Sequence, residues 1–280
     1  MFDLHCHILP GLDDGASSLS VALDMARRQV DQGVEVVACT PHILPGVYAN
    51  SGSEIVPAVS RFQEHLGDAG IPLQLVSGAD NHISPNFVAD LQRGHLLPIN
   101  GSRYVLVEPP HHNQPPRLEA VFWDIIAAGH VPILTHPERL EWINVKGGFD
   151  VFRRLHQRGV GMQVTAGSLT GRFGKRAKYW AERLVCEGLV DILASDAHNL
   201  TTRPPDLDRG ARAAEGLVGQ NAAHHMVVTA PKAILENSSV VEPPVLQAGA
   251  RRSQSNAAYS GGDGRDSLTG RLRRAFGQSR

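Results

Sequence analysis

The first fifteen residues of the chain include a pair of histidines of the kind that bind metal ions. A short strand is predicted over residues 1–4, and it runs directly into His5, Cys6 and His7. Side chains on a strand alternate between its two faces, so His5 and His7 point the same way while Cys6 points the other. A turn rich in Gly and Asp follows, and it contains Asp14. Imidazole and carboxylate groups together suit ions such as Zn²⁺, Mn²⁺ or Fe²⁺. Two histidines on a half-buried structural strand would show the same local pattern.

The same chemistry returns after six of the seven predicted strands. The candidate metal ligands, each following a strand, are His5, His7, Asp14, His42, Asp80, Glu108, His136, Asp196 and His198. Any one of them could be a helix cap or a satisfied polar group. Together they would line a core poorly, because buried charge must be paired or bound to a cation. Nine ligands exceed the four to six bonds that one ion commonly makes, so two ions are predicted and three are allowed.

Strands and helices alternate along the chain with short turns marked by glycine. Strands are predicted at 1–4, 34–39, 73–76, 104–107, 131–134, 161–164 and 191–194; helices are predicted after Ser17 or Ser18, at 53–69, 117–128, 149–157 and 178–185, with two more between 207 and 235. This order indicates a parallel sheet with helical crossovers. An open doubly wound sheet would concentrate its site at one switch point, whereas a barrel brings many strand ends to one mouth. We therefore predict a distorted (β/α)7 TIM-like barrel.

Composition sets the domain limits and argues against several functions. Of 280 residues, 42% are hydrophobic and 20% are charged, as in a globular protein with a substantial core. We predict one domain over residues 1–242 and a disordered tail over 243–280, which is rich in Arg, Ser and Gly. The tail carries seven Arg and two Asp, so the rest of the chain has 20 basic against 26 acidic residues. An acidic domain is a poor candidate for binding nucleic acid.

Cysteine usage and the absence of long apolar runs indicate a cytoplasmic protein without membrane insertion. The three cysteines, Cys6, Cys39 and Cys186, are widely spaced and imply neither a disulfide framework nor a cysteine zinc site. A cysteine-based phosphatase needs an Arg six residues after its nucleophile. Those positions hold Leu, Pro and Ile here, so that chemistry is excluded.

Two arginines could overhang the mouth of the barrel. Arg139 comes three residues after His136, and Arg203 comes five after His198. A guanidinium group there would bind a phosphate bidentately, although loop arginines in surface ion pairs would have the same spacing. His111 could touch a substrate, but it lies in a proline-rich loop where a solvated position is the alternative. His82 is interpreted as structural.

With these residues in view, the sequence resembles the polymerase-and-histidinol-phosphatase (PHP) superfamily. Within it, the chain is similar to the manganese-dependent protein-tyrosine phosphatases encoded with bacterial capsule and exopolysaccharide export systems. The resemblance covers about residues 1–235, and its motifs are residues 3–15, Thr40-Pro41-His42, His136-Pro137-Glu138-Arg139 and residues 194–205. It implies a trinuclear site of Mn²⁺, with Fe, Zn, Co or Mg as alternatives. The implied ligand sets are His5, His7 and Asp196; Glu108 and His136; and Asp14, His42 and His198.

The resemblance also implies a reaction and a partner. Arg139 and Arg203 match the family's phosphate-binding arginines, while Asp80 stands where the family usually has a Glu that bridges two ions. The implied activity is hydrolysis of phosphotyrosine on a polysaccharide-export tyrosine kinase, by a metal-bridging hydroxide and without a cysteine nucleophile. A homo-oligomer is compatible with this function. The alternatives are a small-molecule phosphatase or phosphodiesterase of the same superfamily, and a non-catalytic, metal-bound regulator of the kinase.

Overall fold

The computed structural model describes residues 1–240, in which short strands alternate with helices. The strands are β1 (Phe2–Cys6), β2 (Val36–Cys39), β3 (His42–Ile43), β4 (Gln74–Ser77), β5 (Asp80–His82), β6 (Tyr104–Glu108), β7 (Val131–Thr135), β8 (Gly161–Thr165) and β9 (Ile192–Ala194). The α-helices are α1 (Leu19–Asp31), α2 (Gly52–Asp68), α3 (Phe87–Gln92), α4 (Leu118–Ala127), α5 (Gly148–Gln157), α6 (Ala166–Leu169), α7 (Gly174–Cys186), α8 (Leu207–Val218), α9 (Gln220–His224) and α10 (Ala230–Leu235). The predicted boundary at residue 242 and the tail beyond it lie outside the described residues.

The strands pair in parallel, in the orders β1-β2-β4 and β3-β5-β6-β7-β8-β9. Two interruptions separate these sheets. Pro41, which has no N–H to donate to the ladder, lies between β2 and β3, and Gly78 lies between β4 and β5. Backbone hydrogen bonds continue across the interruptions, from the Gly78 N–H to the Cys39 carbonyl at 3.1 Å and from the Asp80 N–H to the Pro41 carbonyl at 3.2 Å.

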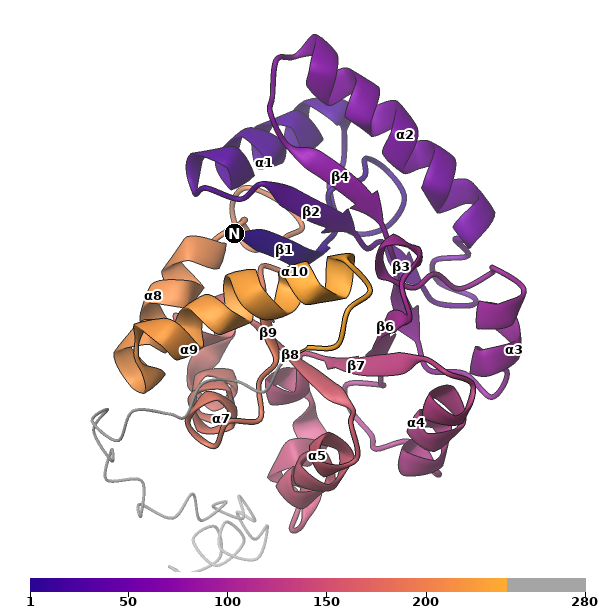
Figure 1. Cartoon of the computed structure of the whole chain (residues 1–280), viewed down its shortest axis with the longest axis vertical. Helices are drawn as coiled ribbons and strands as arrows, with labels where there is room; N and C mark the ends of the chain where they lie inside the picture. The colour runs from indigo at the N-terminus through magenta and orange to yellow at the C-terminus, as the bar shows by residue number, and fades with distance from the viewer. Residues whose placement is uncertain (241–280) are drawn as a thin grey trace, which may run out of the picture. The chain divides into compact units, whose positions relative to one another are not determined.

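The sheet curls until its first strand meets the segment that follows its last. The Asp196 N–H donates to the His5 carbonyl at 2.8 Å, and the His7 N–H donates to the Ala197 carbonyl at 2.9 Å. In Figure 1 the strands gather near the centre, and helices such as α2, α4, α5 and α8 lie around them. The described residues therefore form a curled parallel α/β sheet, as the sequence predicts in coarse form.

Two apolar layers hold the curled sheet in place. Alternate residues of β6, Tyr104 and Leu106, join an inner cluster, while the residues between them face the surrounding helices. Because strand side chains alternate, Glu108 continues the inward series beyond Leu106. At the amino end of β6, the Tyr104 hydroxyl donates to the Ser238 carbonyl at 2.6 Å, and Ile234 of α10 joins the inner cluster. Helix α10 crosses in front of the strands in Figure 1. It covers their amino ends, and the polar residues lie at the opposite ends.

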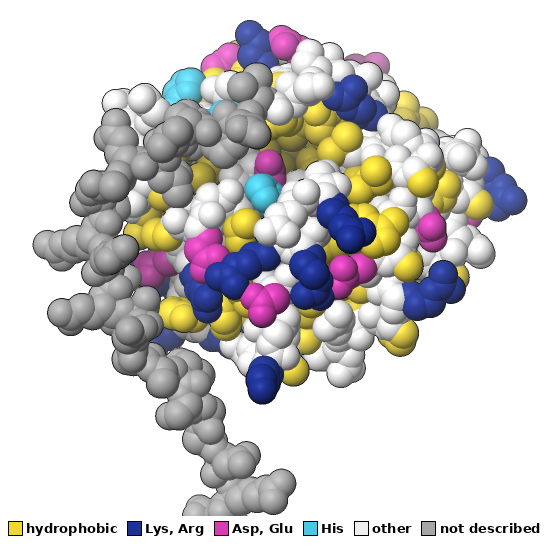
Figure 2. Space-filling model, turned by 60° about the horizontal axis from the view of Figure 1, so that its bottom comes forward, with side chains coloured by type: hydrophobic (Ala, Val, Ile, Leu, Met, Phe, Trp, Pro, Cys, Tyr) yellow, Lys and Arg dark blue, Asp and Glu magenta, His cyan; other side chains and the backbone are white. Residues whose placement is uncertain are grey.

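Ion pairs cover part of the outer surface of α4 and α5. Arg153 of α5 lies 2.6 Å from Glu187, and Arg154 lies 2.7 Å from Glu119 of α4. Figure 2, in which the lower part of Figure 1 comes forward, shows Lys and Arg side chains interspersed with Asp and Glu. Positive and negative side chains are therefore mixed on that face. Among residues 1–240, none of the helices combines the length and the apolar character that crossing a lipid bilayer requires.

Candidate metal centre

All nine predicted ligands lie at the carboxyl ends of the strands and face one another. Their nitrogen and oxygen atoms form five overlapping groups, and within each group the atoms lie within 4.8 Å of one another. The groups are His7-Asp14-His42-His198, His5-His7-Asp196, His5-Asp80-His136, His42-Asp80-Glu108 and Glu108-His111-His136. Every group shares a residue with another. The structure therefore brings the nine residues into one continuous cluster, joined by His111.

The opening loop folds back onto His7 because residue 15 is a glycine. A Cβ at Gly15 would lie 2.1 Å from the His7 carbonyl oxygen, so only glycine fits. The fold-back brings Asp13 Oδ2 to 2.6 Å from His7 Nδ1, and the His42 N–H donates to the same oxygen at 2.9 Å. Burial raises the pKa of Asp13, but the charge of His7 outweighs it and holds that pKa below its usual value. Asp13, which the sequence places in the same turn as Asp14 but which is not one of the nine predicted ligands, therefore orients His7 with its Nε2 toward the cluster.

Asp14 is the most exposed of the nine predicted ligands. Its side chain is 45% exposed, and its Oδ1 lies 3.3 Å from His198 Nε2 and 3.6 Å from His42 Nε2. Burial raises the pKa of Asp14, but the adjacent His198 and the charge of the other nearby imidazoles lower it overall. The cluster thus opens to solvent on the side of Asp14.

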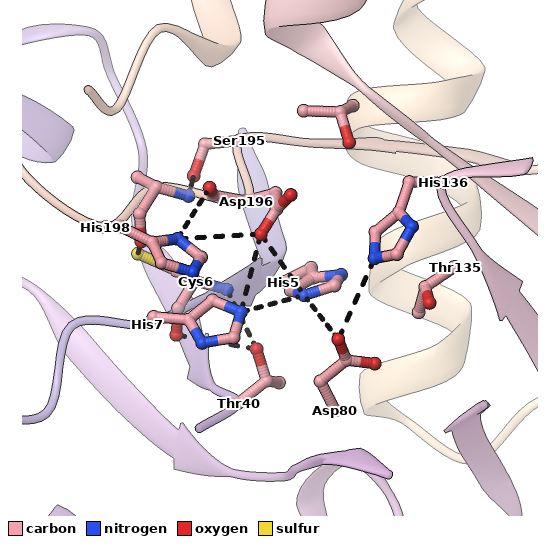
Figure 3. A network of polar contacts seen from close by, with 12 residues as sticks. His5, Cys6, His7, Thr40, Asp80, Thr135, His136, Ser195, Asp196 and His198 are labelled. Atoms are coloured by element: carbon pink, nitrogen blue, oxygen red, sulfur yellow. Dashed lines mark hydrogen bonds and ion pairs between the residues drawn. The ribbon is translucent and has the colours of Figure 1, made fainter. Parts of the chain in front are cut away.

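Asp80 lies among three imidazoles, those of His5, His42 and His136, and Figure 3 shows two of them, His5 and His136, beside its carboxylate. Its Oδ2 is 3.5 Å from His5 Nε2, 3.5 Å from His42 Nδ1 and 3.8 Å from His136 Nε2. Burial and the charge of Glu108 raise the pKa of Asp80, yet the imidazoles outweigh them and hold it below its usual value. The aspartate side chain, although shorter than the family's usual glutamate, therefore reaches all three imidazoles.

Four histidines of the cluster fall into two electrostatic classes. Burial lowers the pKa of His5 and of His42, but the surrounding carboxylates outweigh it and raise both to about 9. Burial and nearby positive charge together lower the pKa of His136 to about 3 and that of His198 to about 4. Neutral imidazole is the form that binds a metal ion. His136 and His198 are therefore ready to bind at neutral pH, whereas His5 and His42 must first lose a proton.

Asp196 joins the predicted ligands to the two predicted arginines. Its backbone lies in the left-handed region, with φ at +49°, which is strained for a residue other than glycine. Its carboxylate lies 3.5 Å from His5 Nε2 and 3.4 Å from His7 Nε2, and it accepts hydrogen bonds from Arg139 Nη1 and, at 2.8 Å, from Arg203 Nη2. Burial raises the pKa of Asp196, but the guanidinium charges outweigh it and hold that pKa well below its usual range. Both arginines therefore lie at the edge of the cluster.

Glu108 has more imidazole partners than the sequence indicated. Its Oε1 lies 3.6 Å from His136 Nε2 and 3.2 Å from His111 Nε2, and its Oε2 lies 3.6 Å from His82 Nδ1. The sequence predicted a contact with Glu108 for neither His82 nor His111. The spacing of three residues from Glu108 to His111 was the available signal. The backbone of His136, with φ at +36°, lies in the left-handed region, as that of Asp196 does.

The donor set fits divalent cations. It consists of five imidazoles and four carboxylates, a mixture that suits Mn²⁺, Fe²⁺ or Zn²⁺. Within residues 1–240, both oxygens of Asp80, His42 Nδ1 and His198 Nε2 are buried without a hydrogen-bond partner, which is costly unless a cation binds them. Behind the cluster, Gln163 Oε1 lies 2.9 Å from His5 Nδ1 and leaves Nε2 directed at the carboxylates.

Residues 1–236 match the family described as "Capsular polysaccharide synthesis, CpsB/CapC". This chain belongs to the CpsB/CapC family. Among its relatives, the tyrosine-protein phosphatase YwqE of Bacillus subtilis is 37% identical over 203 residues, which cover 72% of this chain and 79% of YwqE. The tyrosine-protein phosphatase CpsB of Streptococcus pneumoniae is 25% identical over 242 residues, which cover 84% of this chain and 98% of CpsB.

A solved structure supports the same membership. The match is to a chain from the crystal structures of B. subtilis YwqE and S. pneumoniae CpsB. The TM-score is 0.82 at 34% sequence identity, and the match covers 87% of this chain and 98% of the other. Those proteins are described as unique metal-dependent tyrosine phosphatases. The resemblance to capsule-associated phosphatases that the sequence predicts is thus confirmed at the level of the CpsB/CapC family.

Proposed function

We propose that this CpsB/CapC chain is a metal-dependent phosphomonoester hydrolase that acts as a protein-tyrosine phosphatase. The observation that carries the proposal is the single cluster of nine candidate metal ligands with two arginines at its edge. The names of its relatives YwqE and CpsB support the same reaction. Burial raises the pKa of the Cys6 and Cys39 thiols, and the thiolate is the reactive form, so neither cysteine suits a nucleophile's role.

The architecture that supports this function is a distorted (β/α)7 barrel. In this reading β2 with β3, and β4 with β5, are each one strand interrupted near its middle. The hydrogen bonds that continue across the interruptions at Pro41 and Gly78, and those that join β1 to the segment after β9, support the count of seven. Such closure accounts for the convergence of so many strand ends.

Two or three Mn²⁺ ions would be held by residues already in contact. The proposed sets are His5, His7 and Asp196; Glu108 and His136; and Asp14, His42 and His198, with Asp80 between them. Each set lies within one of the groups of mutually close donor atoms. When bound, the ions would lower the pKa of coordinated water toward neutrality and neutralise charge on the phosphate oxygens.

Arg139 and Arg203 would bind the phosphate group. Both donate to Asp196, and Arg203 Nη1 also lies 3.7 Å from Asp14 Oδ2, on the exposed side of the cluster. A guanidinium group offers several N–H donors in one plane, so it can bind two phosphate oxygens at once and stabilise charge that develops on them.

The proposed substrate is a phosphotyrosine in a protein, in particular a polysaccharide-export tyrosine kinase. Phenol, with a pKa of about 10, is a better leaving group than an alkyl alcohol. Every imidazole near the mouth contacts a carboxylate, so the site offers no obvious general acid to protonate a leaving group. An aryl ester, which needs such an acid less, therefore suits it. The family's description as capsular polysaccharide synthesis proteins supports a partner from that machinery.

The test is turnover of p-nitrophenyl phosphate and of a phosphotyrosine peptide by purified protein, measured with added Mn²⁺ and after chelation, together with metal analysis. His136→Ala should lose nearly all turnover and part of the bound metal. His156→Ala is the matched control, because His156 pairs with Asp191 at 3.5 Å and belongs to none of the five groups. It should retain wild-type turnover.

Three results would contradict the proposal. Turnover that survives complete removal of metal would exclude a metal-dependent reaction. A strong preference for a phosphodiester would favour a phosphodiesterase. Bound metal without hydrolysis of any phosphate ester would favour a non-catalytic regulator.

A further inference from the structure

Arg139 lies against an aromatic ring as well as against Asp196. Its guanidinium carbon is 4.6 Å from the centre of the Phe173 ring. A guanidinium group stacks through its flat face, while its N–H groups point outward in the plane. Contact with Phe173 therefore restricts rotation of the Arg139 side chain and leaves its donors free for a carboxylate or a phosphate.

The backbone at Arg139 is held by the same region of the chain. Arg176, in the first turn of α7, donates from Nη2 to the Arg139 carbonyl at 3.2 Å and from Nη1 to the Leu140 carbonyl at 3.3 Å. Arg139 is the last residue of the 3-10 turn Pro137–Arg139, and the Leu140 carbonyl also accepts from the Ile143 N–H at 3.3 Å. Buried Glu138, in the same 3-10 turn, accepts a hydrogen bond from the Ser168 hydroxyl of α6 at 2.7 Å. The turn that carries Arg139 is therefore fixed to both α6 and α7.

The position of the Phe173 ring is itself set by close packing. A Cβ at Gly167 would lie 3.0 Å from Phe173 Cε2, so the ring lies directly against the glycine backbone. Gly171, in the turn between α6 and α7, and Gly174, the first residue of α7, both have φ at +85°, and the Arg172 N–H donates to the Gly167 carbonyl at 2.9 Å. The ring is thus held between Gly167 and the Arg139 guanidinium.

We propose that Phe173 and Arg176 are positioning residues for Arg139, which they hold in the orientation that binds the substrate's phosphate group. Phe173 fixes the guanidinium plane and Arg176 fixes the backbone from which the side chain extends. This inference rests on the proposed phosphatase function, because it gives Arg139 a phosphate to bind.

The experiment is a double-mutant cycle on the Mn²⁺-loaded, full-length protein. We would compare Phe173→Leu, Arg139→Ala and the double variant, using kcat and KM for p-nitrophenyl phosphate and the Kd of inorganic phosphate. Phe173→Leu should lower kcat/KM by about 3- to 30-fold, the range of one partly buried cation–π contact. It should weaken phosphate binding in the same direction. In the Arg139→Ala background it should cause less than about a twofold further loss, since coupled residues are not additive.

Two variants separate positioning from packing. Phe173→Tyr keeps the ring and should restore activity to within about twofold of wild type. Phe149→Leu is the matched control, because the Arg153 and Arg183 guanidinium carbons lie 4.7 and 4.2 Å from the Phe149 ring outside the cluster. It should leave kcat/KM unchanged.

The inference is overturned if Phe173→Leu matches wild type, or if it loses activity equally with and without Arg139. If Phe173→Leu does not fold, the same cycle with Arg176→Ala decides the question by the same criteria. If wild-type protein hydrolyses no phosphate ester, the proposed function fails. The Kd of inorganic phosphate then still tests positioning, and equal values for wild type and Phe173→Leu would refute it.

Discussion

Replacing Asp80 with Asn should lower the pKa of two histidines by a large amount. In the metal-free protein the pKa values of His5 and His42 are raised from 6.5 to about 9 by the carboxylates around them. Asp80 Oδ2 lies 3.5 Å from a ring nitrogen of each. At that distance and an effective dielectric constant of about 20, one charge pair contributes up to about 5 kcal/mol, or about 3.5 pKa units.

We therefore expect Asp80→Asn to bring the pKa of His5 down by about two to three units, toward or below its ordinary value. The pKa of His42 should fall in parallel. Asp80→Glu, which keeps the charge, should leave both pKa values high. The assay is an NMR titration of ¹⁵N-labelled histidines in chelator-treated protein between pH 4 and 10.

The consequence for metal binding follows from competition with protons. With a pKa of about 9, each of His5 and His42 should weaken apparent metal affinity by about tenfold for every pH unit below 9. The reasoning is refuted if both histidines titrate between pH 6 and 7 in the wild-type protein, or if Asp80→Asn leaves their pKa values unchanged.

Three further outcomes are expected. Metal-free protein should be most stable near pH 6.5 in urea unfolding. As the pH rises from 6.5 toward 9, the free energy of unfolding falls, because native His5 and His42 hold protons that the unfolded chain has lost. As the pH falls below 6.5 it also falls, because the unfolded chain binds protons that native His136 and His198, with pKa values of about 3 and 4, do not. A higher stability at pH 9 than at pH 6.5 would contradict this. Gly15→Ala should cost about 2 kcal/mol or more and reduce bound metal, whereas Gly216→Ala, at a helical position with open space around it, should be neutral or slightly stabilising by the same assays. Deletion of residues 245–280 should leave kcat/KM for p-nitrophenyl phosphate unchanged, and a large loss would refute the predicted domain boundary.

The convergence of the candidate ligands could be predicted from the sequence because it depends on strand order alone. Side chains that follow parallel strands meet at one edge of the sheet whatever the loops between them do. Glu108 shows this, since the alternation of β6 places it on the same side as Leu106. The same rule placed Asp80 correctly, although its strand is interrupted just before it.

The contacts made by loops could not be predicted in the same way. Which member of the pair Asp13 and Asp14 points at His7 depends on how the chain turns at Gly15, and that close approach is a tertiary contact. The loop carrying His111 is rich in proline, and its path decides whether the imidazole reaches Glu108 or solvent. The sequence pattern gives the residue type at such loop positions but does not determine where the side chain points.

The charges in the cluster balance without a metal ion, and this constrains when a phosphate can bind. Four of the predicted ligands are carboxylates. They face two protonated imidazoles, His5 and His42, and the two guanidinium groups of Arg139 and Arg203. Divalent ions would displace the imidazole protons and supply more positive charge than those protons carried. The bound ions would then neutralise the Asp196 carboxylate in place of the arginines, and the arginine N–H groups would become available to an anionic substrate without reorientation of the side chains. Phosphate should therefore bind tightly only after the metal does, with the arginines passing from a protein carboxylate to the substrate.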